Sequence, residues 1–461
     1  MLFHSTRGKD NNKNFEQVLM QGLAKDGGLF MPNNWPEVDK EELKNLDNFI
    51  DVAKYIVPLF TSSSFDKSEV ERLLDETWHH FDKKDLINIF EIDKSISILE
   101  LFHGPTAAFK DFGLQLAAAF FNKTLQIQNK TAVVFGATSG DTGSAAIDAC
   151  KEFGLIKSFI LIPEGNMSEI QRKQMTTVDK DNVFPILASG TFDDCQDIVK
   201  KGFSERTFLK DDQYLLAVNS INWVRIIGQI CYYFYVSLKI NKLSEPLNFS
   251  VPTGNFGNVF ACYAASKMGM PLSKIVVAVN SNDILDRFFK NNDYSKFKVN
   301  ETISPSMDIS VASNFERLLY DFYLDGDSDL CSKLYSKFPD ESIKINETIW
   351  KKSSDLFMSY SSDDTSTYKC MQFYYKNFNY IMDPHTAVAA DAVKSLKDKL
   401  KGKTIILSTA HPAKFPSALE NAGLSIENIP KKLSEVLSKN EVAEKLSTKD
   451  DSIFEYIKEN N

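Results

Sequence analysis

Short apolar runs alternate with helical patterns between residues 96 and 285, and this alternation is the strongest structural signal in the chain. The clearest runs occupy residues 131–135, 159–162, 183–186 and 275–279. Each run precedes a loop and a helical pattern, which is typical of parallel strands buried on both faces. The pattern returns over residues 381–425, with an apolar run at 404–407. The chain is therefore predicted to have an α/β core built on parallel strands.

The segments that flank this core have other patterns and divide the chain into predicted domains. Residues 1–95 are predicted as a mainly helical N-terminal domain, because amphipathic helical periodicity marks residues 15–23 and 68–81. Residues 96–430 form the α/β core, with a helical insertion near 290–375 that is rich in Asp, Ser, Lys and aromatic residues. Residues 431–461 are rich in Lys and Glu and are predicted as a helical tail.

Composition narrows the class of protein. The 461 residues carry a net charge of −9, which argues against non-specific binding to nucleic acid. No apolar run is long enough for a membrane span, and no signal-peptide pattern opens the chain. The six cysteines are scattered without a Cys-x-x-Cys pair, so neither a zinc site nor a disulfide framework is indicated. Reduced thiols in the cytoplasm are the expected state.

One lysine stands in an apolar context next to Gly and Pro. The segment HGPTAAFKDFG, from His103 to Gly113, places Lys110 just before a helical pattern. An apolar setting or a nearby cation lowers the pKa of an amine, and reactive Schiff-base lysines arise in this way. A Lys followed by Asp is also an ordinary solvated helix start. This segment alone leaves both interpretations open.

Two Gly-rich loops follow predicted strands, at the sheet edge where ligands bind in open parallel sheets. The loop GATSGDTG at 136–143 opens a helical pattern and suits an anion such as a carboxylate, although an ordinary capped turn has the same residues. It is not a Walker A loop, because no Lys follows its last Gly. The loop PTGNFGN at 252–258 has the form of a phosphate cradle, with an ordinary Gly turn as the alternative.

A third segment, STAHPAKF at 408–415, ends the strand predicted at 404–407. The hydroxyls of Ser408 and Thr409 lie where they can hydrogen-bond a ring heteroatom. His411 precedes a proline and is held extended, and a lone His at such a place is more often structural than catalytic.

Together, a reactive-lysine candidate, a phosphate cradle and a hydroxyl at a strand end resemble a pyridoxal-phosphate site. The segments HGPTAAFKDFG, GATSGDTG, NSINWVR, TGNFGN and STAHPAKF occur in the order found in the threonine synthase family, and STRG at 5–8 and GLAKDGGL at 22–29 also fit. The resemblance covers nearly the whole chain and is to the shorter bacterial and fungal branch. It implies the tryptophan-synthase-β-like fold, which is fold type II of pyridoxal-phosphate enzymes, with a two-lobed core and a helical N-terminal domain.

The resemblance also implies roles for individual residues. Lys110 matches the Schiff-base lysine, Thr409 matches the residue that bonds the pyridine nitrogen, and Asp141 lies near the phenolic oxygen. Asp141 is then protonated, turned to backbone amides, or a helix cap, and these three roles stay open. The residues that match the loop for the cofactor phosphate are Gly254, Asn255, Phe256, Gly257 and Asn258.

The substrate site implied by the resemblance has two parts. Thr138, Ser139 and Thr142 match the loop for the substrate carboxylate, which also includes Asp141. The segment for the substrate phosphate contributes Asn219, Ser220, Asn222 and Arg225. On composition alone, Arg225 would more often be a surface ion-pair residue. Arg7 and Lys414 are further candidates for phosphate contact.

The implied activity is conversion of O-phospho-L-homoserine and water to L-threonine and phosphate, the last step of threonine biosynthesis. Lys110 is then the proton shuttle, and the protein is expected to be a cytoplasmic monomer. Three alternatives remain: a dehydratase or β-replacing enzyme of the same fold, a catalytically inactive homologue that only binds ligand, and an NAD-dependent oxidoreductase. The dehydratase would not need the segment at 219–225.

Overall fold

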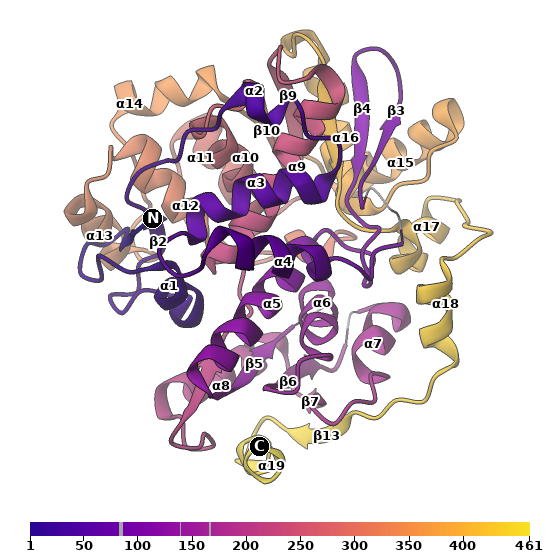
Figure 1. Cartoon of the computed structure of the whole chain (residues 1–461). Helices are drawn as coiled ribbons and strands as arrows, with labels where there is room; N and C mark the ends of the chain where they lie inside the picture. Colours follow the sequence, from indigo (N-terminus) through magenta and orange to yellow (C-terminus); the bar gives the residue numbers. More distant parts are fainter. Residues whose placement is uncertain (83–85, 139, 166) are drawn as a thin grey trace.

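Two sheets of mainly parallel strands, each covered by helices, form the core of the computed structural model (Figure 1). The structure describes residues 1–82, 86–138, 140–165 and 167–461. The larger sheet has six strands, in the spatial order β11 (Phe357–Ser361), β10 (Leu272–Val279), β9 (Leu247–Pro252), β12 (Thr404–Ser408), β4 (Ile96–Glu100) and β3 (Asn88–Glu91). Only the edge hairpin β3–β4 is antiparallel among these pairs.

The smaller sheet has five strands, and all four of its strand pairs are parallel. Its spatial order is β13 (Glu444–Ser447), β7 (Val183–Ser189), β6 (Ile156–Pro163), β5 (Thr131–Ala137) and β8 (Gln213–Leu216). Every apolar run predicted as a strand lies in one of the two sheets. The prediction of a two-lobed α/β core is confirmed.

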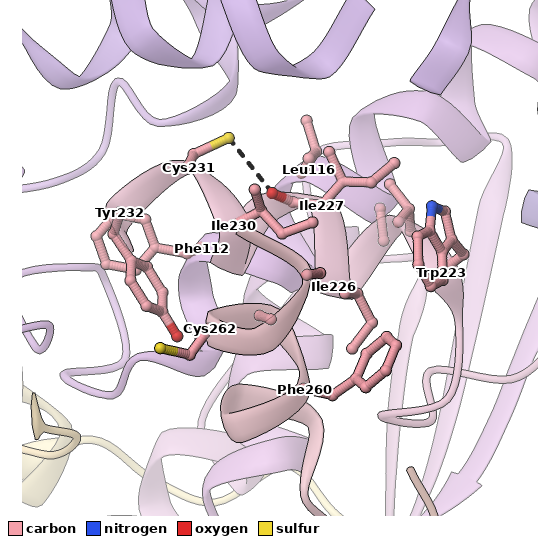
Figure 2. Close-up of a cluster of buried hydrophobic side chains, with 14 of the residues drawn as sticks. Phe112, Leu116, Trp223, Ile226, Ile227, Ile230, Cys231, Tyr232, Phe260 and Cys262 are labelled. Carbon is pink, nitrogen blue, oxygen red and sulfur yellow. Dashed lines mark hydrogen bonds between the residues drawn. The ribbon is translucent and has the colours of Figure 1, made fainter. Parts of the chain in front are cut away.

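The helices α5 (Lys110–Gln128) and α9 (Trp223–Asn241) pack against each other at the centre of the molecule. Residues 223–238 of α9 are all buried, because the helix is apolar around almost its whole circumference. Figure 2 shows its side chains packed with those of neighbouring helices: Tyr232 lies beside Phe112 of α5, and Trp223 lies near Phe260 of α10 (Gly257–Lys267). This core ties the helix that begins at Lys110 to the helix that carries Arg225.

The remaining helices of the core cover the sheets. Those on and around the five-stranded sheet are α6 (Asp141–Cys150), α7 (Glu169–Thr176), α8 (Phe192–Glu205) and α19 (Ser452–Asn460). Those of the six-stranded half include α11 (Ile284–Asn291), α15 (Asp364–Phe378), α16 (Pro384–Leu396) and α17 (Pro416–Asn421). The helix α18 (Lys431–Ser438) packs against α7.

The N-terminal region packs its helices on α9 and α5. It contains β1 (Phe3–Ser5), α1 (Phe15–Gln21), β2 (Phe30–Pro32), α2 (Lys40–Leu43), α3 (Phe49–Thr61) and α4 (Lys67–Thr77). The helices predicted from residues 15–23 and 68–81 are α1 and α4. In Figure 1 the indigo helices of this region lie against the centre of the molecule, where α3 contacts α9 and α4 contacts α5.

Two segments that were predicted as helical also contain strands. Residues 290–375 hold the short helices α12 (Phe315–Leu318), α13 (Ser328–Lys337) and α14 (Glu347–Lys352), together with the strand β11. The tail holds β13 between α18 and α19. Each of these two strands is at the edge of its sheet and has one neighbouring strand there, and neither has a continuous apolar run.

All six cysteines are buried and free. They are Cys150, Cys195, Cys231, Cys262, Cys331 and Cys370. Among the described helices, none combines the length and the apolar character that a membrane crossing requires.

Candidate active site

The ends of neighbouring strands bring the predicted segments to one edge of the six-stranded sheet. Because β4, β12 and β9 are adjacent and parallel, the loops that follow them leave the sheet side by side. Two backbone hydrogen bonds join the first two loops: Phe109 donates to the Thr409 carbonyl at 2.8 Å, and His411 donates to the Ala107 carbonyl at 3.0 Å. Thr409, itself buried, is thereby held next to the start of α5 and Lys110.

The loop before Lys110 is shaped by the neighbouring Asp111. The Asp111 carboxyl group accepts hydrogen bonds from the backbone N–H and the hydroxyl of Thr106, at 2.9 and 2.6 Å. A Cβ on Gly104 would lie 2.4 Å from the same carboxyl group, so only glycine fits there. Burial raises the pKa of Asp111 to about 7. These contacts fix the backbone conformation of the loop that leads to Lys110.

Lys110 is partly exposed, and its Nζ donates to the hydroxyl of Ser306 at 3.4 Å. Burial lowers the pKa of its amine to about 8, and the positive charges of Arg225 and Lys414 act in the same direction. The negative charge of Asp141 opposes this shift without cancelling it. Much more neutral amine is present near neutral pH than for an ordinary lysine, which suits a nucleophile or base.

The described contacts of Asp141 are with side chains, which matches none of the three roles left open for it. The Nζ of Lys414 lies 2.7 Å from Asp141 Oδ1, and Gln171 Nε2 donates to the same oxygen at 2.9 Å. Burial disfavours the carboxylate, yet the charges of Lys414 and Lys110 together hold the pKa of Asp141 well below its usual range. Lys414 is fully buried and its charge is matched by Asp141, so it is not a free phosphate ligand.

The loop after β9 has the features of a phosphate cradle. Phe256 adopts a left-handed backbone conformation with φ of 64°, and the first turn of α10 follows with N–H groups that have no acceptor within the helix. The Oδ1 of Asn258 accepts hydrogen bonds from the hydroxyls of Tyr232 and Tyr233. Its Nδ2 is therefore turned away, buried, and without a partner among the described residues. An oxyanion would satisfy these donors.

Arg225 is buried, and the interpretation of this residue as a surface ion-pair residue is wrong. One of its nitrogens, Nη1, donates to the Val218 carbonyl at 2.9 Å. Its Nε is buried and has no acceptor in the described part of the chain. Burial lowers the pKa of the guanidinium to about 10, so the group keeps its charge at neutral pH. An anion is the partner that this side chain lacks.

Several residues implied as substrate ligands make structural contacts. The Thr138 hydroxyl accepts from the backbone N–H of Gly143 at 2.9 Å and so holds the start of α6. Asn222 caps α9, and its Nδ2 donates to the Leu19 carbonyl at 2.9 Å. Ser139 lies outside the described residues. The side chains of Thr142, Asn219 and Ser220 keep at least partial exposure.

Arg7 and His411 also have structural partners. Arg7 forms a two-point ion pair with Glu316, through Nε at 3.1 Å and Nη2 at 2.9 Å. The His411 Nδ1 accepts the Ala413 N–H, and burial together with the Lys432 charge lowers the pKa of its ring to about 4. His411 is therefore neutral at physiological pH.

Sequence reasoning missed a group of polar residues from the segments after β10 and before α16. Asn314 donates to the Asn255 carbonyl at 3.0 Å and to the Ser220 hydroxyl at 3.3 Å, so it joins the phosphate loop to the segment before Arg225. The buried Arg317 donates in turn to Asn314 and to the Ile221 carbonyl. The rule that ligands gather beyond strand ends applies also to β10 and would have directed attention to this segment.

The broad class of the protein follows from its match to a family model. The family model described as pyridoxal-phosphate dependent enzyme matches residues 92–337, which is more than half of the chain. The α/β core with its parallel strands is thus that of a pyridoxal-phosphate enzyme. Models described as threonine synthase N terminus and as threonine synthase, C-terminal, match residues 2–78 and 386–457.

Individual relatives define the family. A threonine synthase of Pseudomonas aeruginosa is 41% identical, over 92% of this chain and 91% of its own length. The Saccharomyces cerevisiae threonine synthase is 39% identical, over 91% of this chain and 89% of its own. A crystal structure of pyridoxal-phosphate-bound threonine synthase from Brucella melitensis matches with a TM-score of 0.95 at 35% identity, covering 100% of this chain and 99% of that one. The chain belongs to the threonine synthase family.

Proposed function

We propose that this protein converts O-phospho-L-homoserine and water to L-threonine and phosphate, the last step of threonine biosynthesis. Family membership supports this activity over most of the chain. The observation that supports this activity most directly is Arg225. It is a buried cation, its Nε has no acceptor among the described residues, and its charge helps to lower the pKa of Lys110. Such a group fits a substrate that bears a phosphate of its own, apart from the cofactor phosphate.

The cofactor is pyridoxal phosphate, and the residues present fit it. The loop from Gly254 to Asn258 would hold the phosphate, because Asn258 Nδ2 and the first N–H groups of α10 lack protein acceptors. Thr409 would meet the pyridine nitrogen, and the Lys110 amine would meet the aldehyde carbon. When bound, the cofactor supplies an electron sink for negative charge that develops at the substrate α-carbon.

The residues of the chain then divide the remaining work. Lys110, with a pKa of about 8, can accept the α-proton and return a proton to a neighbouring carbon of the substrate. Arg225 would bind the substrate phosphate and so fix the far end of the molecule. Thr142 and the loop at 136–143 would hold the substrate carboxylate at the N-terminus of α6. Binding the substrate at both its phosphate and its carboxylate would favour closure of the active site and exclusion of bulk water.

The protein acts on a small molecule, and we propose that it does so as a cytoplasmic monomer without a nucleic-acid partner. The net charge of −9 supports the last point. Six buried, unoxidised thiols fit a reducing compartment. Size-exclusion chromatography with light scattering tests the monomer, and a mass near 104 kDa in place of 52.2 kDa would contradict it.

Phosphate release and amino-acid analysis test the activity. Purified, cofactor-loaded protein is given O-phospho-L-homoserine in one reaction and serine or threonine in others. Equal amounts of phosphate and threonine are expected from the first. Ammonia and keto acid from serine or threonine, with no phosphate from the first, would assign the protein to the dehydratases.

Substitution of Lys110 tests the role of the amine. Lys110→Ala is expected to abolish turnover, since no other described group offers an amine at that place, while the phosphate cradle retains part of the cofactor affinity. Equilibrium dialysis measures the retained cofactor. Near-normal turnover in Lys110→Ala would remove Lys110 from the mechanism. Thr142→Ala is the companion variant, expected to raise KM rather than to abolish turnover.

A further inference from the structure

Ser306 lies between the amine of Lys110 and the phosphate loop. It belongs to a short 3₁₀ turn, η1 (Pro305–Met307), which follows β10 and α11 in the chain. Its hydroxyl accepts the hydrogen bond from Lys110 Nζ. Its carbonyl oxygen lies so close to Gly254 that a Cβ there would be 2.7 Å away. Ser306 therefore touches both the reacting amine and the loop proposed to hold the cofactor.

A cluster around Asp308 fixes this turn from one side. The Asp308 carboxylate accepts hydrogen bonds from Asn280 at 2.7 Å, from Asn282 at 3.0 Å and from Thr302 at 2.7 Å. Asn280 directly follows β10 and is buried. The turn is thus anchored to the end of a central strand, and its backbone has little freedom to move away from Lys110.

A buried histidine fixes the turn from the other side. The backbone N–H of Ser306 donates to His385 Nε2 at 3.2 Å. The Nδ1 of the same ring lies 2.8 Å from Asp383 Oδ1, and Asp383 is fully buried. Since Nε2 accepts, the ring proton is on Nδ1, and Asp383 holds the ring in that tautomer. His385 thus acts as an acceptor for the Ser306 backbone at the N-terminus of α16.

We propose that Ser306 is a further catalytic residue, whose hydroxyl holds the Lys110 amine in the direction of the reacting carbons, and that Asp383 and His385 are its positioning residues. The inference rests on the proposed role of Lys110. A lysine amine is at the end of a flexible four-carbon stem. In the proposed role, this amine must exchange protons with more than one carbon of the substrate. A hydrogen-bond partner on a rigid turn limits the directions that the amine can take.

The other groups that act on the amine are charged. Asp141 at the start of α6, Arg225 on α9 and Lys414 in the 3₁₀ turn η5 (Pro412–Lys414) contribute opposing charges. Ser306 is the neutral hydrogen-bond acceptor that faces Nζ among the described residues. An acceptor favours the protonated form of the nitrogen that donates to it. Loss of the hydroxyl should therefore move the protonation of the Lys110 nitrogen to lower pH.

Steady-state kinetics on cofactor-loaded protein provide the first test. Ser306→Ala is expected to lower kcat by about tenfold, the equivalent of one lost hydrogen bond in the transition state, with KM and cofactor affinity changed by less than about twofold. Ser306→Thr keeps the hydroxyl and should recover most of kcat. Ser361→Ala is the matched control, because its hydroxyl donates to the Asn280 carbonyl in the same region and does not face Lys110.

The visible absorption band of the bound cofactor provides a readout that does not depend on turnover. The pH midpoint of this band is expected to move to lower pH in Ser306→Ala and to stay near the wild-type value in Ser306→Thr. His385→Ala should shift the midpoint in the same direction. His385→Gln should shift it less, because the Gln oxygen can accept the Ser306 N–H.

The two readouts separate this inference from the proposed function. If kcat and the absorption midpoint of Ser306→Ala both equal those of the wild type, Ser306 has no catalytic role. If Ser306→Ala and Ser306→Thr both lose the cofactor, the turn is only structural, which also overturns the inference. If the wild type makes no threonine and the midpoint still responds to Ser306, the proposed function fails and the role of Ser306 at Lys110 stands.

Discussion

Lys414 and Asp141 illustrate at the scale of single residues how the site balances its charge. Four ionised side chains act on one another there, and the ion pair between Lys414 and Asp141 leaves Lys110 and Arg225 with a net positive field. That field suits a doubly anionic substrate. Pairing with Lys414 also offsets the repulsion that the Asp141 carboxylate would exert on the phenolic oxygen, beside which the family resemblance places it.

The variant Lys414→Met tests the energetic role of this pair. It leaves the buried Asp141 carboxylate without its ion-pair partner, so the free energy of unfolding should fall by about 3–5 kcal/mol in urea titrations at neutral pH. The double variant Asp141→Asn with Lys414→Met should recover a large part of the lost free energy of unfolding. Wild-type Asp141 has a lowered pKa, so its stabilisation is present above about pH 4 and is lost as the pH falls. The stability difference should narrow in acid, and a constant difference would contradict the pairing.

The charge of Arg225 leads to a second prediction for single residues. Because this charge contributes to lowering the pKa of Lys110 to about 8, Arg225→Ala should raise that pKa. Stopped-flow absorbance should then show slower capture of pyridoxal phosphate by cofactor-free protein near neutral pH, with the rate rising at a higher pH than in the wild type. Arg72→Ala on the exposed face of α4 is the control and should leave the pH profile unchanged.

At the scale of elements, two glycines set the distance between α5 and α9. A Cβ on Gly113 would lie 3.1 Å from the Arg225 backbone, and a Cβ on Gly228 would lie 3.0 Å from the Phe112 carbonyl. The close crossing therefore fixes Lys110 relative to Arg225. Gly113→Ala is expected to cost about 1–3 kcal/mol in urea titrations and to raise KM, although Ala favours helix. Gly154→Ala, where a Cβ meets open space, should be nearly neutral.

Some strands could be predicted from the sequence pattern and others could not. Central strands such as β5 and β10 were predicted because burial on both faces demands continuous apolar residues. The edge strand β13 is mostly exposed and has no such run, so its pairing with β7 depends on tertiary contacts. Local sequence could single out Lys110 and the loop at 252–258 as candidates, while an ordinary helix start and an ordinary Gly turn remained open. The contact between Ser306 and His385 joins residues 79 positions apart, and no local pattern encodes it.

At the scale of the whole molecule, the C-terminal tail connects the two halves. Lys432 of α18 donates to the His103 carbonyl, in the loop that leads to Lys110, while β13 covers the edge of β7 in the five-stranded sheet. Figure 1 shows this yellow segment running along the outside of the molecule to α19. The tail therefore contacts the loop that follows β4 of the six-stranded sheet and the edge of the five-stranded sheet, which are distant in sequence.

Removal of residues 443–461 tests this connection. The truncated protein exposes the edge of β7, so it should melt at a lower temperature and aggregate on heating. Differential scanning fluorimetry with light scattering measures both effects. Lys445→Ala, which keeps the backbone pairing of β13, should behave like the wild type. Unchanged melting of the truncated protein would mean that the tail adds no stability.

The six buried thiols have a use beyond packing. Burial raises the pKa of Cys150 to about 12 and of Cys195 to about 11, so the folded protein presents little reactive thiolate. Cys150 and Cys195 are in helices of the five-stranded half, whereas Cys262 and Cys370 are in helices of the six-stranded half. An alkylating reagent would thus record, cysteine by cysteine, which half of the molecule opens first under stress. The order in which the individual cysteines are alkylated would therefore report the order in which the two halves unfold.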